Sequence, residues 1–128
     1  MPLETTRSEV ARLLGEPKFV YKNADLFFRP GEKVHIEYAA GRCKGLLPNW
    51  DVKRGTVLSV YVKPMKPVPF DADKLGIGFV RGLVNDDLSV EYSNSKNGVK
   101  YSVNEFGELS SISYTPDRIS GAKFVCKK

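Results

Sequence analysis

The chain has 128 residues, 41% of them hydrophobic and 27% charged, and these values are typical of a soluble single domain. No apolar run approaches the ~20 residues that cross a bilayer, so the sequence contains no membrane-spanning helix. The formal net charge of +5 is unevenly spread. Residues 42–66 carry six basic side chains against Asp51 alone, and residues 118–128 carry four basic side chains and no acidic one.

The first predicted element is a helix over residues 7–14. Thr6 and Glu9 form the pattern of a capping box, in which each side chain bonds the backbone N–H of the other residue. The helix is expected to end at Gly15, before Pro17. Its apolar residues share one face at helical spacing and are expected to pack on the sheet: Val10, Leu13 and Leu14.

Strands dominate the remainder of the prediction. Alternating and β-branched runs predict strands at residues 18–22, 26–29, 33–38 and 56–63. A loop over 40–55, an extended Pro-rich connection over 64–69 and a helical turn over 71–75 lie around them. The last runs, at 88–93, 99–104 and 109–114, predict a three-stranded antiparallel meander covered by the N-terminal helix. The expected fold is therefore a single α+β domain over residues 1–128.

Aromatic residues divide into two groups. Strand parity predicts core positions for six of them, namely Phe19, Phe28, Tyr38, Tyr92, Tyr101 and Tyr114. Trp50 and Phe124 instead lie in basic segments, where an exposed ring is a plausible recognition element. The alternative for Trp50 is that its ring packs against one end of the sheet.

Two cysteines, Cys43 and Cys126, are present, and no C-x-x-C motif occurs. They are either two free thiols or one disulfide that closes a loop of more than 80 residues. A disulfide would favour an oxidising, extracytoplasmic compartment. We therefore expect a periplasmic or secreted protein, exported by a signal peptide that this sequence does not include.

Residues that carry catalytic chemistry are hard to find in this sequence. His35, the single histidine, is expected on the solvent-exposed face of its strand beside Lys33 and Glu37, and no nucleophile lies near it in the sequence. Asp71 and Asp73 fail the calcium-loop pattern, and Asp71 is better explained as a helix cap. We expect no enzyme, no catalytic residue, no metal site and no cofactor.

The strongest candidate for a binding site is the cationic surface that a disulfide between Cys43 and Cys126 would create. It would join the two basic segments at one end of the domain. The cations expected to bind an anionic partner there, with Trp50 as the apolar contact, are Lys44, Lys53, Arg54 and Lys123.

Residues 6–17, a Thr-led helix that ends in Leu-Leu-Gly-Glu-Pro, resemble the N-terminal helix signature of the SmpA/OmlA family. The resemblance implies a BamE-like fold, similar to that of β-lactamase-inhibitor proteins, and a small bacterial envelope protein. The helix start, the Gly-x-Cys loop, the Trp50-Asp51-Val52 segment and the final cysteine are also similar to uncharacterised secreted bacterial proteins.

These features favour a non-enzymatic extracytoplasmic module that binds or scaffolds an unknown protein or an anionic envelope component. One alternative is a nucleic-acid-binding domain that uses the basic segment 42–66. Another, which rests on the resemblance in fold, is a protein inhibitor of a secreted enzyme.

Overall fold

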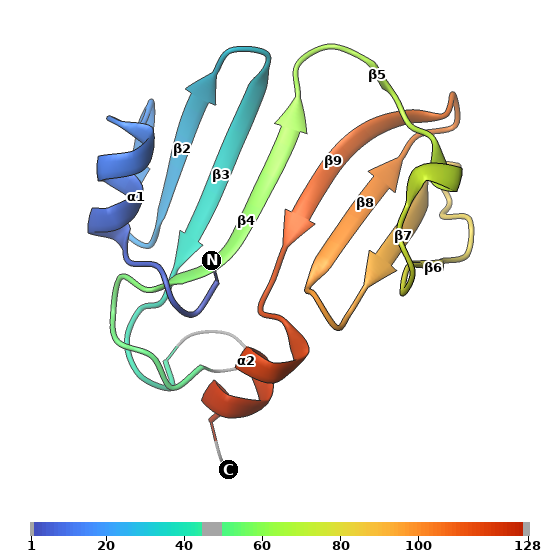
Figure 1. Ribbon diagram of the computed structural model, residues 1–128. Helices are drawn as coiled ribbons and strands as arrows, with labels where there is room; N and C mark the ends of the chain where they lie inside the picture. The colour runs from blue at the N-terminus through green and yellow to red at the C-terminus, as the bar shows by residue number, and fades with distance from the viewer. Residues whose placement is uncertain (1, 45–49, 127–128) are drawn as a thin grey trace.

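The computed structural model describes residues 2–44 and 50–126. Its strands form one antiparallel sheet in the order β1-β2-β3-β4-β9-β8-β7-β6, with β5 paired to β9 (Figure 1). The bounds are α1 Arg7–Leu14, β1 Phe19–Tyr21, β2 Ala24–Arg29, β3 Glu32–Tyr38, β4 Val57–Pro64, β5 Val68–Pro69, η1 Ala72–Lys74, β6 Val80–Arg81, β7 Val90–Asn94, β8 Val99–Val103, β9 Glu108–Tyr114 and α2 Arg118–Phe124.

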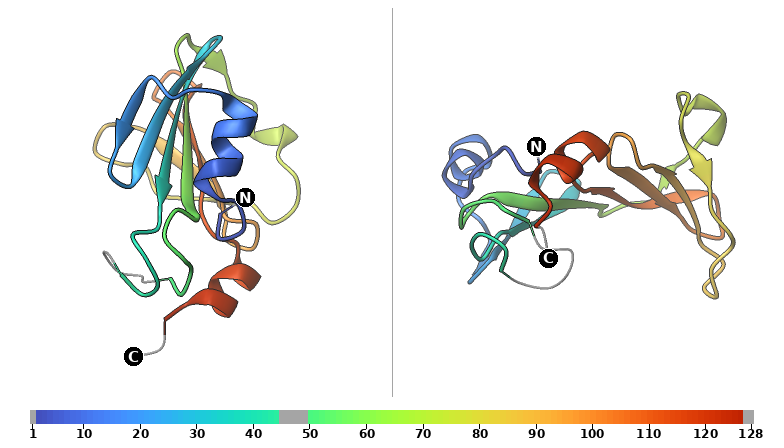
Figure 2. Two further views of the ribbon diagram at one scale, coloured as in Figure 1. Left: turned by 90° about the vertical axis from the view of Figure 1, so that its left-hand side faces the viewer. Right: turned by 90° about the horizontal axis from the view of Figure 1, so that it is seen from below.

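The sheet has one covered face and one open face. Seen from below, α1, α2 and the segment around η1 all lie on the same side of the sheet (Figure 2, right). Among the described residues no helix covers the other face, which is called the open face below. The predicted α+β class is confirmed in outline, although the sheet contributes far more of the chain than the helices do.

The helix α1 begins and ends as the sequence predicts. Thr6 caps it by accepting from the backbone N–H of Glu9, and Gly15 follows its last turn with a positive φ. Val10 is buried and Leu14 packs beside it in a core formed with Phe27, Val34, Ile36, Tyr38, Val57, Val60 and Val62. Burial of such side chains contributes roughly 1.5–3 kcal/mol each.

Two parts of the helix prediction are wrong. Leu13 is 75% exposed, because its position turns it away from the line through Val10 and Leu14. The core under α1 belongs to β2, β3 and β4 rather than to the C-terminal meander. The meander is covered instead by the segment around η1, where Phe70 contacts Tyr92 and Tyr101 with ring centroids 5.3 and 5.5 Å apart.

Two predicted core aromatics lie at the surface. Phe19 and Phe28 are 49% and 47% exposed on the open face, because no second layer covers β1 and β2 there. Tyr38, in contrast, is buried as predicted. The C-terminal segment, expected to be an irregular tail, forms α2, which Asp117 caps by accepting from the backbone N–H of Ser120.

Candidate functional site

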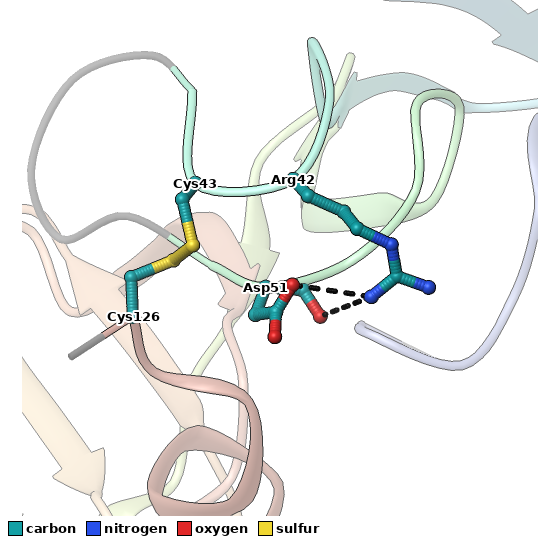
Figure 3. Close-up of a disulfide and its surroundings, with 4 residues drawn as sticks. All are labelled: Arg42, Cys43, Asp51 and Cys126. Carbon is teal, nitrogen blue, oxygen red and sulfur yellow. Dashed lines mark hydrogen bonds and ion pairs between the residues drawn. A yellow bond between two sulfur atoms is a disulfide. The ribbon is translucent and has the colours of Figure 1, made fainter.

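A disulfide joins Cys43 and Cys126 and closes a separation of 83 residues. Cys43 lies in the loop after β3, and Cys126 follows α2, so the bond links the N-terminal and C-terminal halves of the chain. Close by, Arg42 donates to the carboxylate and the backbone carbonyl of Asp51 (Figure 3). Of the two possibilities for the cysteines, the structure therefore contains the disulfide.

Trp50 lies at the same end and is half-buried. Its backbone carbonyl accepts from the N–H of Cys43 at 2.9 Å, and its ring packs in a second core cluster with Leu3, Val52 and Phe124. Gly121 of α2 faces this ring, and a Cβ on Gly121 would lie 3.4 Å from it. The absence of a side chain at 121 therefore lets α2 approach the indole closely, so Trp50 has a structural role at the end of the sheet.

The exposed part of Trp50 lines a cleft of about 650 Å³, which has the size of a small-molecule site. The cleft lies between the β1–β2 turn, the end of β3, the loop that begins at residue 40 and the chain after β9. Most of its lining is apolar or aromatic, and the charged side chains there are Lys22, Lys44 and Glu37. The apolar lining residues include Tyr21, Ala39, Ala40, Leu58 and Pro116.

One wall of this cleft is held by Arg7 of α1. The Arg7 guanidinium donates to the backbone carbonyls of Tyr21, Lys22 and Ala24, in the turn that forms the wall. It also binds both carboxylate oxygens of Asp25, at 2.6 and 3.1 Å. Five donated bonds from one guanidinium fix the turn in place, so the wall is preformed.

Asp25 is 5% exposed and is the centre of a buried polar cluster. Tyr38 donates its hydroxyl to Asp25 at 2.9 Å, and the Arg7 guanidinium lies 4.8 Å from the centre of the Tyr38 ring. Burial, together with the hydrogen bond to Asp25, raises the pKa of Tyr38 well above its ordinary value. The hydrogen bond to Asp25 also raises the pKa of Arg7, which keeps the guanidinium charged.

The predicted anion-binding residues are distributed over the disulfide end rather than gathered at one point. Lys44 and Trp50 line the cleft described above. Lys53 lines a separate hollow beside Arg42 and Asp51. Lys123 lies over the Phe124 ring at 5.2 Å, and Arg54 is exposed in the turn before β4.

The basic segment 42–66 does not form one continuous surface. Strand β4 carries Lys63 and Lys66 to the opposite end of the sheet from Arg54. Lys127 and Lys128, which contributed to the predicted charge of the C-terminal segment, lie outside the described residues. Of the cations in segment 42–66, Lys63 and Lys66 therefore do not contribute to the charge at the disulfide end.

The cleft walls supplied by Tyr21, Lys22 and Pro116 were missed by sequence reasoning, because they come from segments far apart in the chain. Asp117 after Pro116 was a helix-start signal that could have revealed α2.

His35 faces the open side of β3 between Leu26 and Tyr61 on the neighbouring strands. Within residues 2–44 and 50–126, no three His, Cys, Asp or Glu side chains are placed to hold a metal ion.

Among the described residues no helix is long and apolar enough to cross a membrane. Comparisons with protein-family models, with curated proteins and with solved structures give no match for this chain. The resemblance of residues 6–17 to the SmpA/OmlA helix therefore stays a prediction.

Proposed function

We propose that the protein is a non-enzymatic extracytoplasmic binding module whose disulfide end binds an anionic partner of the cell envelope. The observation that carries the proposal is the cleft in which Lys44 and Trp50 lie together. Its walls are fixed by the Arg7 contacts and by the disulfide, so little ordering cost opposes binding.

The charges around the cleft favour an anion. Lys22 and Lys44 lie in its lining against the single acid Glu37, which accepts a hydrogen bond from Ser59 at 3.4 Å. Lys53, Arg54 and Lys123 add to the positive field at the same end, while Asp51 is paired with Arg42. An acidic group beside an apolar one would match a lining of lysine and aromatic side chains.

The alternatives receive less support. A nucleic-acid platform along 42–66 would need a continuous basic track, and β4 separates its two ends. The disulfide also favours a compartment outside the reducing cytosol. The inhibitor hypothesis rests on the resemblance in fold alone, and no contact in the described residues favours it.

The test uses Trp50, the single tryptophan, as a reporter in its own site. Heparin, a soluble polyanion, is titrated at low and at physiological salt, with neutral dextran as the reference. We expect a change in tryptophan emission with heparin only, weaker at higher salt because the charges are screened.

Matched variants locate the effect. The double variant Lys44→Ala/Lys53→Ala should weaken heparin binding severalfold, whereas Lys74→Ala in η1, far from the disulfide end, should leave it unchanged. Equal weakening by both variants, or no response of Trp50 to heparin at all, would contradict the proposal.

A further inference from the structure

The surface that the proposed function leaves unexplained is the part of the open face of β1, β2 and β3 that lies outside the cleft. Here exposed aromatic rings lie beside cations, and we name this surface the edge patch, defined by Phe19, Phe28, Lys33 and Lys63. Both aromatic residues are about half exposed, with 49% for Phe19 and 47% for Phe28. Exposed apolar side chains that gather in one patch, unlike singly scattered ones, mark sites of interaction with a partner or a membrane.

The register of the sheet brings these residues together. Phe19 pairs with Leu26 across β1 and β2, and Phe28 pairs with Lys33 across β2 and β3. The rings of Phe19 and Phe28 meet edge to face with centroids 6.3 Å apart. The Lys33 ammonium lies 5.6 Å from the centre of the Phe28 ring, so apolar and cationic groups form one surface.

Two lysines of the patch face each other directly. Lys33 on β3 is the cross-strand partner of Lys63 on β4, and both are exposed on the open face. Like charges in this arrangement destabilise a sheet. Their juxtaposition next to exposed rings indicates a surface that binds negative charge, and Lys18, directly before β1, adds to the same positive field.

We propose that the edge patch docks onto the surface of an anionic lipid bilayer. Exposed Phe side chains enter the boundary between the lipid headgroups and the acyl chains, and lysines are drawn to anionic lipids. Seen from below, β1 and β2 bend to the side of the sheet away from α1, so the patch lies at a projecting edge (Figure 2, right). Docking through a few surface rings and lysines is interfacial and reversible.

The ring geometry distinguishes a bilayer from single-stranded nucleic acid. A nucleic-acid base stacks on an aromatic side chain only where a face of the ring is open to solvent. Phe19 and Phe28 stand 76° apart in an edge-to-face pair, and Lys33 lies over the Phe28 ring. Such rings suit insertion between lipid headgroups better than they suit stacking on bases.

The opposite edge of the sheet offers a matched control. Around β6, Ile77 and Leu83 are more exposed than any ring of the edge patch. Their charged neighbours include the acids Asp73, Asp86 and Asp87, so the local charge does not favour an anionic membrane. Apolar exposure alone predicts docking at both edges, whereas our proposal predicts docking at β1 only.

The experiment is co-sedimentation with large vesicles of phosphatidylcholine, with or without the anionic lipid phosphatidylglycerol. We expect binding to the anionic vesicles only. Phe19→Ser/Phe28→Ser should lower the partition coefficient at least tenfold, and Lys33→Ala about fivefold. Ile77→Ser/Leu83→Ser should leave it unchanged.

This proposal is independent of the disulfide-end cleft, and the two can fail separately. Because Phe19 and Phe28 lie outside the cleft, the Phe19→Ser/Phe28→Ser variant should keep the tryptophan response to heparin. A cooperative urea melt of the variant, which needs no ligand, shows that it is folded. Equal binding to neutral vesicles, equal loss with the Ile77→Ser/Leu83→Ser variant, or tight binding of an oligothymidylate that displaces the vesicles would overturn it.

Discussion

The two halves of the sheet are stabilised in different ways. In the half built from β1 to β4, α1 covers the sheet and Arg7 ties it to the buried Asp25 and to the β1–β2 turn. In the half built from β6 to β9, aromatic contacts such as Phe79 against Tyr101 replace the helix, and no buried ion pair occurs among its described residues. Geometry in the first half is set by directional hydrogen bonds, which hold one wall of the cleft.

Few backbone pairs join the two halves of the sheet. Strands β4 and β9 are joined by three residue pairs, including Val60 with Tyr114. The disulfide is a second connection, because Cys43 belongs to the first half and Cys126 follows the second. This comparison indicates which substitutions should lower the free energy of unfolding most.

Removing the disulfide should have the largest effect. The variant Cys43→Ser/Cys126→Ser opens a loop of 83 residues, so the unfolded chain gains entropy worth about 4–5 kcal/mol. We expect urea unfolding of the variant to shift by about that amount. Dithiothreitol should destabilise the wild type to the same level and leave the variant unchanged; a wild type insensitive to reduction would show that the second connection is unimportant.

Arg7→Ala should be the next most severe change. It leaves the Asp25 carboxylate buried without its ion-pair partner, and the loss of such a partner costs about 3 kcal/mol. Arg12→Ala, an exposed position on the same helix, is the matched control and should cost less than about 0.5 kcal/mol. Urea melts measure both, and similar costs for the two variants would show that the ion pair does not anchor α1.

A smaller loss of stability should distinguish the buried face of α1 from its exposed face. Leu14→Ala removes a side chain that packs on the first core and should cost about 2 kcal/mol. Leu13→Ala, which removes an exposed side chain of the same composition, should change the free energy of unfolding by less than about 0.5 kcal/mol. Equal losses would mean that both leucines are buried.

The smallest effect is a dependence on alkaline pH. Below pH 10 Tyr38 keeps its proton in the folded and unfolded states, so its contribution to stability is fully present. Above pH 10 the unfolded chain ionises while the folded Tyr38 does not, and the free energy of unfolding falls by at most about 1.4 kcal/mol per pH unit. Tyr38→Phe should remove this part of the decline; an unchanged slope would show that other groups cause it.

Local patterns predicted the fold well where a single segment decided the outcome. The cap at Thr6, the alternation of β3 and the turns of the C-terminal meander all act between near neighbours, and the structure confirms them. Which face is covered depends on distant segments. Strand parity therefore placed Phe19 and Phe28 in a core, although no second layer within residues 2–44 and 50–126 covers their side.

The candidate site was predictable only in part. The sequence offered the disulfide as one of two alternatives for the cysteines, and the structure contains it. The position of Trp50 near basic residues follows from local composition. The walls formed by Tyr21 and Pro116 do not, because contacts of Arg7 and the path of β9 into α2 bring them there. A charge count along the chain also overstated the patch, since β4 carries Lys63 away from it.

The central claim is that charge, and not apolar exposure alone, gives the β1 edge of the sheet a binding role that the β6 edge lacks. Hydrogen–deuterium exchange followed by mass spectrometry, with and without phosphatidylcholine vesicles that contain phosphatidylglycerol, compares both edges in one sample. We expect slower exchange over residues 18–29 and unchanged exchange over residues 75–89. Protection confined to residues 75–89, or equal protection of both edges, would contradict it.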